Sequence, residues 1–359
     1  MSLNINDLET PALLIDREVM LENLKRMQAI AESHGVSLRP HTKNHKCPEI
    51  AKLQLELGAS GICVQKLGEA EVMVDAGVKD IFITNEIVQP TKIDRLVKLQ
   101  DKASVRVAVD SFENAQQIGE IAAGSNCVLP VLVDVDTGMK RCGVPLGPVA
   151  VKLASAVAKT KGLRFDGLMT FEGHLYEITN PSKRKAAAQR TIERFVRLGK
   201  KIRQNGLDVS VMSCGSTPTA EAVAGVKGIT ELQPGNYVFY DLMQIEKGSA
   251  RLLNCAQRIL TTIISSPSKN RCIVDAGTKA FAHDHGEFPK ALGGTRGTPT
   301  QINEEHLTLR TRSRLRIGDK IQFLPYHACT ATNMFDQVHV VEGATVIATW
   351  PIAARGKMV

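Results

Sequence analysis

The sequence predicts a mixed α/β protein, in which an N-terminal (β/α)8 TIM barrel precedes a mostly-β C-terminal domain. From about residue 35, short runs of apolar and β-branched residues alternate with amphipathic stretches, which is typical of parallel strands joined by crossover helices. After about residue 245 the helical stretches stop and strand-like segments remain. The length of 359 residues suits a barrel of roughly 250 residues with a smaller second domain.

The barrel prediction depends on the number of strands. Eight segments have the composition of buried strands, and helical segments such as 48–57 and the more regular 189–204 lie between them. Eight β/α repeats favour a closed barrel. A doubly wound open sheet is the alternative, but no glycine-rich dinucleotide-binding pattern follows the first strand. The candidate strands are residues 37–41, 61–65, 80–84, 105–110, 128–136, 163–171, 209–214 and 229–239.

The C-terminal part contains further strand-like segments without intervening helices. We therefore expect the barrel to span residues 15–245 and the β domain to include residues 246–359. The stretch 292–300, rich in Gly and Thr, is expected to be a loop because strand-like segments flank it. The candidate strands are residues 256–265, 272–275, 306–310, 320–324, 337–341 and 345–350.

Composition and charge exclude several classes of function. The formal charge of +8 comes from scattered Lys and Arg residues, and only one Trp and four Tyr are available for stacking on bases, so we expect no nucleic-acid partner. Residues 1–8 lack the features of a secretory signal, and no apolar run reaches the length of a membrane span. Most of the eight cysteines lie in apolar runs typical of buried reduced thiols. We therefore expect a cytoplasmic protein.

Polar residues close several of the predicted barrel strands. In a barrel of this kind the active site lies at the carboxyl ends of the strands, so these residues are candidates for the site. They are His41 and Lys43 after the first strand, Gln65 after the second, Asp136 and Arg141 after the fifth, Glu172 and His174 after the sixth, and Gly215, Ser216 and Thr217 after the seventh.

Lys43 is the candidate nucleophile of this group. A lysine that is buried near other cations, here Arg39 and Lys46, loses its proton more readily and can then attack an aldehyde. The alternative is that Arg39, His41, Lys43, His45 and Lys46 form a solvated basic loop. The residues alone leave both interpretations open.

Two turns near the ends of the seventh and eighth strands have the composition of phosphate-binding loops. The stretch 214–219 (Cys-Gly-Ser-Thr-Pro-Thr) precedes a predicted helix, whose free amides and dipole would attract a phosphate. The second turn contains Pro234, Gly235, Asn236 and Tyr237. Each is also compatible with an ordinary turn. Together they favour phosphate, because barrels commonly bind it after strands seven and eight.

His327 and Cys329 are candidate metal ligands at the end of a strand in the β domain. Residues two apart in a strand point the same way, and imidazole with thiolate suits zinc. Two ligands do not complete a tetrahedral site, so packing or chance is the alternative. Water and a substrate oxygen could complete the site, which would then be catalytic.

Motifs along nearly the whole chain resemble the fold-type III pyridoxal-phosphate enzymes that include D-threonine aldolase, D-serine dehydratase and D-3-hydroxyaspartate dehydratase. The resemblance implies a small D-amino acid substrate and a homodimer with active sites near its interface. It also implies that residues 1–14 contribute a strand to the β domain. The matching segments are residues 7–12, 38–49, 61–70, 137–144, 214–219, 231–239, 275–277 and 325–329.

The resemblance also implies roles for individual residues. Lys43 would hold pyridoxal 5'-phosphate as a Schiff base, and Arg141 would lie beside its ring. Ser216, Thr217, Asn236 and Tyr237 would surround the phosphate, while His327 and Cys329 would bind a divalent metal, either zinc or manganese. We also assign His41, Gln65, Gly215 and Gly235 to cofactor binding, since they lie in the same strand ends and turns.

The sequence contains signals for two different reactions within this family. The segments 45–51 and 61–66 resemble D-threonine aldolase, which favours retro-aldol cleavage of D-β-hydroxy amino acids to glycine and an aldehyde. Cys329 favours D-serine or D-3-hydroxyaspartate dehydratase, because the aldolases place Asp there and the dehydratases place Cys. Phe171, Glu172, Gly173 and His174, after the sixth strand, depart from both patterns. More distant alternatives are a non-catalytic regulator that binds the cofactor, and a racemase or decarboxylase, which would not need metal ligands.

Overall fold

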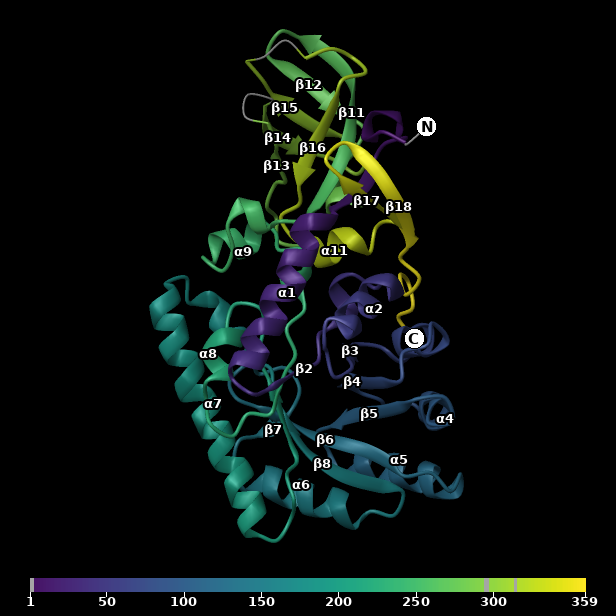
Figure 1. Ribbon diagram of the computed structural model, residues 1–359, viewed down its shortest axis with the longest axis vertical. Helices are drawn as coiled ribbons and strands as arrows, with labels where there is room; N and C mark the ends of the chain where they lie inside the picture. Colours follow the sequence, from purple (N-terminus) through teal and green to yellow (C-terminus); the bar gives the residue numbers. More distant parts are fainter. Residues whose placement is uncertain (1–2, 294–296, 313–314) are drawn as a thin grey trace. The chain divides into compact units, whose positions relative to one another are not determined.

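The computed structural model of the chain describes residues 3–293, 297–312 and 315–359 (Figure 1). The chain divides into two compact units. The β unit consists of Met1–Lys25, Asn44–Glu49 and Asn236–Arg355, and the barrel unit consists of Arg26–Lys43, Ile50–Gly235 and Gly356–Val359.

Parallel strands form the sheet of the barrel unit, in the order β2-β10-β9-β8-β6-β5-β4-β3. His41, just beyond β2, forms a parallel bridge with Cys63 of β3, so the sheet curls back on itself. All eight predicted barrel strands are confirmed as elements of this sheet. They are β2 (Ser37–Leu38), β3 (Ile62–Val64), β4 (Asp80–Glu86), β5 (Ser104–Val109), β6 (Leu129–Asp136), β8 (Leu163–Met169), β9 (Val211–Cys214) and β10 (Glu231–Leu232), and the short β7 (Val144–Pro145) pairs with β6.

Helices connect these strands, and α4, α5 and α6 lie on the outer side of the sheet (Figure 1). Local sequence fixes their ends: the Ser111 side chain accepts a hydrogen bond from the Asn114 backbone at the start of α5. Asn180 caps α7 in the same way, so this helix begins at Pro181 and not at residue 189. The helices are α1 (Arg17–Ser33), α2 (Pro48–Glu56), α3 (Leu67–Asp75), α4 (Pro90–Leu99), α5 (Phe112–Gly124), α6 (Pro148–Lys159), α7 (Pro181–Gln204) and α8 (Ala220–Ala224).

A second sheet, in the order β14-β15-β12-β11-β1-β17-β18, forms the β unit, and β16 pairs with β11 and β13. The N-terminal strand β1 (Ala12–Asp16) lies between β11, to which it is antiparallel, and β17, to which it is parallel. The other strands are β11 (Gln257–Ser268), β12 (Arg271–Val274), β13 (Lys290–Ala291), β14 (Thr298–Ile302), β15 (Leu307–Arg310), β16 (Lys320–Leu324), β17 (Gln337–Glu342) and β18 (Thr345–Pro351).

Two local predictions are wrong. Residues 229–239 are not one strand: only Glu231–Leu232 pair, and the 3-10 helix η4 (Asn236–Val238) follows. Pro234 has no N–H to donate to a ladder, which explains why the strand ends before it. The predicted loop 292–300 ends in β14, which pairs with β15, while residues 294–296 lie outside the described part of the chain.

Apolar side chains fill the interior of the barrel sheet. Cys63, Phe82, Ala108, Leu132 and Met169, which come from five different strands, are buried together. Burial of such side chains contributes about 1.5–3 kcal/mol each, which makes this layer a rigid support for the strand ends above it. Among the described residues, no helix is long and apolar enough to span a membrane.

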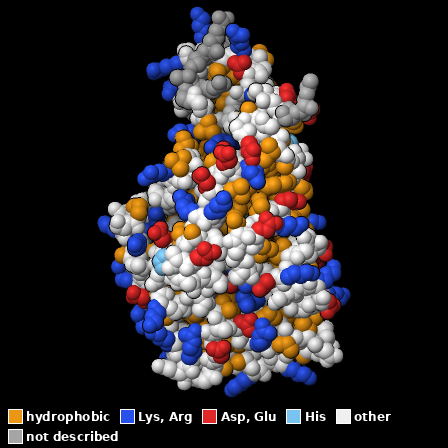
Figure 2. Space-filling view, in the orientation of Figure 1, with side chains coloured by type: hydrophobic (Ala, Val, Ile, Leu, Met, Phe, Trp, Pro, Cys, Tyr) orange, Lys and Arg blue, Asp and Glu red, His pale blue; other side chains and the backbone are white. Residues whose placement is uncertain are grey.

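Charged side chains of both signs are interspersed on the molecular surface. Figure 2 shows Lys and Arg side chains on one face next to Asp and Glu, without a single basic stripe. The net charge of +8 therefore does not produce a basic track on this face of the kind that nucleic-acid-binding proteins use.

Candidate functional site

Lys43 lies in a single 3-10 turn, η2 (Thr42–Asn44), which follows the first barrel strand. Its side chain is half-buried, and its Nζ lies 5.6 Å from the centroid of the Phe171 ring. Phe171 follows β8, on a different part of the same sheet. The amine of Lys43 is therefore directed over an aromatic face at the carboxyl ends of the strands.

The basic residues around Lys43 are not a solvated loop. Arg39 is 4% exposed, and His41, His45 and Lys46 are 6%, 1% and 7% exposed. The Arg39 guanidinium forms ion pairs of 2.7 Å with both Glu231 and Asp80. The alternative of a solvated basic loop is therefore wrong, and Arg39 is a buried cation paired with two carboxylates.

His41 connects Lys43 to the next two strands. The backbone N–H of Lys43 donates to His41 Nδ1 over 3.3 Å, so the ring proton lies on Nε2. His41 Nε2 lies 3.0 Å from Thr84 Oγ1 and 3.3 Å from Gln65 Oε1. The Gln65 amide then donates to the Thr84 carbonyl over 3.3 Å. This chain of hydrogen bonds fixes the loop that carries the lysine.

Arg141 also lies against Phe171, since its Cζ is 5.2 Å from the ring centroid. Arg141 and Phe171 line a hollow of about 10 Å³, roughly the volume that one water molecule occupies. Phe171 thus lies within reach of both cationic side chains that were predicted to contact a cofactor ring. These contacts were not predicted, because an aromatic residue at the end of a strand is usually part of the core.

The predicted phosphate turn at 214–219 already binds a carboxylate of the protein. Glu172 is fully buried and accepts hydrogen bonds from the backbone N–H of Ser216 (2.8 Å), from that of Gly215 (3.3 Å) and from the Thr219 hydroxyl. These two amides are therefore not available to a phosphate in this conformation. The Ser216 hydroxyl also lies 2.7 Å from Thr219 Oγ1, so an anion at this turn would compete with contacts within the protein.

The second predicted turn belongs to both units. Gly235 packs closely against the first barrel strand, since a Cβ there would lie 3.0 Å from the His41 carbonyl oxygen. Asn236 belongs to the β unit and donates from Nδ2 to the buried Asp241 carboxylate over 2.7 Å. Tyr237 is 1% exposed in the same unit. A side chain at position 235 would therefore be tightly packed against His41, and the Asn236 side chain is held by a carboxylate.

His327 and Cys329 lie just after β16, as predicted, but at the start of a short helix, α11 (Ala328–Thr332), so they are not two residues apart along a strand. His327 is its N-cap residue, and Asn44 Nδ2 donates to Cys329 Sγ over 3.2 Å. Burial lowers the pKa of His327, but the hydrogen bonds to Cys329 and Asp284 outweigh burial and raise it to about 10. Burial raises the pKa of the Cys329 thiol, but the hydrogen bond with His327 outweighs it and the pKa falls below its usual value.

Asp284 and His285 were not predicted as site residues, yet they lie beside His327. Asp284 Oδ2 is 2.6 Å from His327 Nδ1, and the His285 and His327 ring centroids are 5.1 Å apart. Ligand atoms of these three residues lie within 4.8 Å of one another. The sequence signal was the tripeptide His-Asp-His at 283–285, which has no periodic context.

The chemistry of this group fits a divalent metal. Imidazole nitrogen, thiolate sulfur and carboxylate oxygen are the ligands that zinc binds in proteins. The Oδ1 atoms of Asn44 and Asn236, the amides whose nitrogens contact Cys329, are buried without a hydrogen-bond partner among the described residues. Buried acceptors of this kind are normally satisfied by a bound group or by water.

A second group of possible metal ligands, two carboxylates and a thiol, lies in the barrel unit. Glu86, Asp110 and Cys142 have ligand atoms within 4.8 Å of one another. Burial raises the pKa of the adjacent Asp134 to about 7, and the charge of Glu86 contributes to this shift. The nearby Arg141 guanidinium lowers the same pKa and faces this acidic group.

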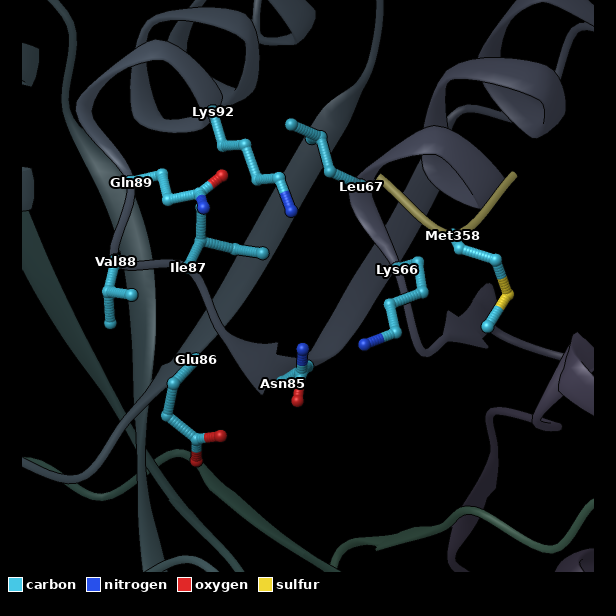
Figure 3. A pocket seen from close by; sticks show the side chains of 9 residues that line it. All are labelled: Lys66, Leu67, Asn85, Glu86, Ile87, Val88, Gln89, Lys92 and Met358. Atoms are coloured by element: carbon cyan, nitrogen blue, oxygen red, sulfur yellow. The ribbon is translucent and has the colours of Figure 1, made fainter. Parts of the chain in front are cut away.

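The barrel unit also contains a larger cavity, of about 220 Å³, at the ends of β3 and β4. Figure 3 shows the ammonium groups of Lys66 and Lys92 directed toward this cavity from two different elements. Asn85, which lines it, accepts a hydrogen bond from Gln65 Nε2 over 3.4 Å. The cavity therefore adjoins the hydrogen-bond chain around His41, although none of the predicted site residues lines it.

Comparison with known proteins identifies relatives along the full chain. The family model of the alanine racemase N-terminal domain matches residues 15–242, and that of the serine dehydratase domain matches residues 256–341. A D-threonine aldolase from Arthrobacter sp. is 35% identical over 97% of this chain and 93% of its own length.

Two solved structures are also similar. The D-threonine aldolase from Filomicrobium marinum has a TM-score of 0.95 and 34% identity, covering 100% of this chain and 99% of its own. The D-threo-3-hydroxyaspartate dehydratase from Delftia sp. has a TM-score of 0.90 and 30% identity, covering 97% and 98%. A cysteine-to-alanine variant of that dehydratase is described as being in a metal-free form. The chain belongs to the fold-type III, pyridoxal-phosphate-dependent family of lyases that contains D-threonine aldolase and the D-serine and 3-hydroxyaspartate dehydratases.

Proposed function

We propose that the protein is a D-threonine aldolase-type lyase, which cleaves D-β-hydroxy amino acids to glycine and an aldehyde with pyridoxal 5'-phosphate and a divalent metal. The observation that carries the proposal is the half-buried amine of Lys43, at the carboxyl end of the first barrel strand and over the Phe171 ring. The similarity to D-threonine aldolases over nearly the full chain supports it.

The barrel unit supplies the groups that fit the cofactor. Lys43 provides the primary amine that forms a Schiff base with an aldehyde, and Phe171 and Arg141 provide a flat face and a cation beside it. Ser216 and Thr217 provide hydroxyl groups for the phosphate. When bound, the pyridoxal ring supplies an electron sink for the bond that breaks. His41, Gln65, Gly215 and Gly235 shape the loops that hold these groups. On the resemblance alone, we also assign Asn236 and Tyr237, which belong to the β unit, to the phosphate contacts.

The β unit supplies the groups that fit the metal. We assign His327 and Cys329 as its protein ligands, because the structure places an imidazole and a thiol in mutual hydrogen-bonding contact. A bound divalent ion would lower the pKa of a substrate hydroxyl and so help it to lose its proton. The soft sulfur ligand favours zinc, while the family leaves manganese as the other candidate.

The overall reaction balances without a further reactant. D-threonine contains the atoms of glycine and acetaldehyde: the Cα–Cβ bond breaks, the hydroxyl proton leaves, and Cα gains a proton. The chain must therefore exclude competing loss of the hydroxyl group. The Phe171 ring and the hydrogen-bonded His41 loop are the contacts that would orient the Lys43 amine for the cleavage.

A second candidate function is the dehydration of D-serine or D-3-hydroxyaspartate to a 2-oxo acid and ammonia. Cys329 favours it, because the dehydratases of this family carry a cysteine at this metal position and the aldolases carry an aspartate. The relatives include a D-threo-3-hydroxyaspartate dehydratase that is 31% identical over 96% of this chain. Both reactions use the same lysine and metal ligands.

The products from one substrate distinguish the two reactions. Purified enzyme with pyridoxal phosphate and Zn²⁺ or Mn²⁺ is incubated with D-threonine, and glycine, acetaldehyde and 2-oxobutanoate are measured. The aldolase proposal expects equal amounts of glycine and acetaldehyde. Predominant 2-oxobutanoate would assign the dehydratase reaction instead. L-threonine serves as the control, since the family acts on D-amino acids.

We also propose a homodimer in the cytoplasm, which the resemblance and the thiols support. All eight cysteines lie in the described part of the chain, and none forms a disulfide. Reduced thiols are normal for cytosolic proteins. Light scattering of the purified protein would give the mass of the assembly, for which we expect two chains.

A further inference from the structure

We propose that Asp284 is a positioning residue for the metal site: it holds Nδ1 of His327, so that Nε2 of His327 and Sγ of Cys329 bind the metal. This inference rests on the metal site of the proposed function. It gives Asp284, which lies outside the His-x-Cys pair, a role in the site, and it identifies Nε2 of His327 as the nitrogen that binds the metal.

The contacts of Asp284 define the arrangement. Its Oδ2 lies 2.6 Å from His327 Nδ1, which is the length of a short charge-assisted hydrogen bond. The Thr330 hydroxyl donates to the same oxygen over 2.9 Å. His285 Nε2 is 3.7 Å from this oxygen, which is beyond hydrogen-bond length. Asp284 is therefore bound to His327 and Thr330 and not to His285.

The chemistry of imidazole determines the consequence. A neutral imidazole carries its proton on one ring nitrogen and a lone pair on the other. Because Nδ1 of His327 donates to the carboxylate, the lone pair lies on Nε2, which is then the ligand atom. A carboxylate at this position fixes the tautomer and the ring orientation and raises the basicity of the ligand.

The surroundings of Cys329 agree with this assignment. Asn44 Nδ2 donates to its sulfur over 3.2 Å, and Asn236 Nδ2 lies 3.8 Å from it. Hydrogen-bond donors stabilise a thiolate, which is the form that binds a metal. Asp241 accepts hydrogen bonds from both Asn236 (2.7 Å) and the Ala328 N–H (2.9 Å), and thereby links the amide to the helix that carries Cys329.

A competing arrangement uses Asp284, His285 and His327 as three direct ligands. Their ligand atoms are close enough to one another for this. It would require Nδ1 of His327 to release its proton to bind the metal, and it would leave Cys329 without a role. The short Nδ1–Oδ2 distance and the second donor from Thr330 favour the hydrogen-bonded arrangement.

Metal affinity separates the two arrangements. Zn²⁺ binding to the holoenzyme is measured by competition with a chromophoric chelator for the wild type, Asp284→Asn and His285→Ala. The positioning role expects affinity to fall roughly 10–100-fold in Asp284→Asn, the usual effect of removing such a partner, and to change little in His285→Ala. Equal losses in both variants would overturn it. Asp284 has a side chain that is 35% exposed, so the substitution leaves the core intact.

Cobalt substitution separates a weaker affinity from a loss of the site, because the band appears only where the sulfur binds the metal. Co²⁺ bound to a thiolate shows a sulfur-to-metal charge-transfer band in the near ultraviolet. The band is expected in the wild type and in Asp284→Asn at saturating Co²⁺, and its loss in Cys329→Ser assigns it to the sulfur. Loss of the band in Asp284→Asn, or its persistence in Cys329→Ser, would contradict the proposed ligand pair.

The two proposals can fail separately. If the wild type binds no metal at any concentration tested, the metal site of the proposed function fails. If the wild type binds metal with the sulfur band and Asp284→Asn binds it equally well, only the role of Asp284 fails. Nitrogen-15 chemical shifts of His327 in the wild type are expected to show a protonated Nδ1.

Discussion

The Nζ of Lys43 lies 5.6 Å from the centroid of the Phe171 ring, and the Arg141 guanidinium lies 5.2 Å from the same centroid. One aromatic side chain therefore contacts two cations that come from different strand ends. A cation over an aromatic face gains about 0.5–1 kcal/mol at partly exposed sites, so the ring holds both groups in place.

Replacing Phe171 with Leu is expected to lower kcat/KM about fivefold, because loss of roughly 1 kcal/mol of preorganisation corresponds to this factor. The matched control is Phe171→Tyr, which keeps the aromatic face and should stay near the wild-type value. Steady-state kinetics with D-threonine measures both. Equal activity of the Leu and Tyr variants would show that the ring face does not matter.

Lys43→Ala is expected to remove the visible absorbance of enzyme-bound pyridoxal phosphate and all catalytic activity. The reason is that the Schiff base needs the primary amine. Lys46→Ala, three residues further on, provides the control and should retain the absorbance. A difference spectrum after gel filtration measures the bound cofactor, and an unchanged spectrum in Lys43→Ala would exclude this lysine.

Glu172→Gln is expected to weaken both the fold and the retention of pyridoxal phosphate. The Gln carboxamide keeps only one acceptor oxygen, so its NH2 group would face the N–H of either Gly215 or Ser216, and a buried mismatch of this kind lowers the free energy of unfolding by about 1–3 kcal/mol. Urea unfolding and equilibrium dialysis of the cofactor measure the two effects. The exposed Glu177, at the end of the 3-10 helix η3 (Gly173–Glu177) that Glu172 precedes, is the control, and Glu177→Gln should change neither.

Asp134 is expected to make stability depend on pH. Burial, together with the charge of Glu86, raises its pKa from 3.8 to about 7 in the folded state. Between about pH 4 and pH 7 the folded state holds a proton that the unfolded state has lost, so this group lowers the free energy of unfolding as pH rises through that window.

The measurement compares wild type and Asp134→Asn by urea unfolding at pH 4.5–8. The variant should become more stable relative to the wild type as pH rises, by about 4 kcal/mol at pH 8, and the difference should level off above about pH 8. Asp136 provides a control of opposite sign. Burial raises its pKa, but the N–H groups of Gly138 and Lys140 outweigh burial and lower it, so its contribution is lost only in acid.

Removal of the metal with a strong chelator is expected to abolish cleavage of D-threonine, and Zn²⁺ or Mn²⁺ should restore it. The absorbance of the bound cofactor should remain, because the Schiff-base lysine is not among the proposed metal ligands. Activity that survives exhaustive chelation would remove His327 and Cys329 from the catalytic site. The measurement is the rate of glycine formation by the chelated enzyme, before and after its dialysis against Zn²⁺ or Mn²⁺.

The sequence predicted the barrel strands well because buried parallel strands are almost continuously apolar, as β6 shows by being buried from Leu129 to Val135. It predicted the last strand poorly because Ile229–Phe239 contains the same apolar residues in a turn and a 3-10 helix. Local composition cannot distinguish a long strand from a two-residue strand followed by a turn and a 3-10 helix.

The contacts that define the site were less predictable because their partners are distant in the chain. Arg39 finds Glu231 192 positions away, so its neutralisation could not be recognised from the basic cluster alone. Glu172 meets Ser216 44 positions later, and Asp284 meets His327 43 positions later. Strand ends and short motifs identified Lys43 and His327 as candidates. The residues that hold them in place can be identified only from the folded structure.

The position of β1 has a consequence for how the chain folds during synthesis. Leu14 pairs with Arg258 on one side and with His339 on the other, so both partners of this strand are made long after it. At roughly 5–20 residues per second, the ribosome needs on the order of tens of seconds to reach them. An apolar strand with two unpaired edges is prone to aggregate in that interval. We expect the barrel to form first and the N-terminal strand to need protection, for instance by a chaperone, until the end of the chain emerges.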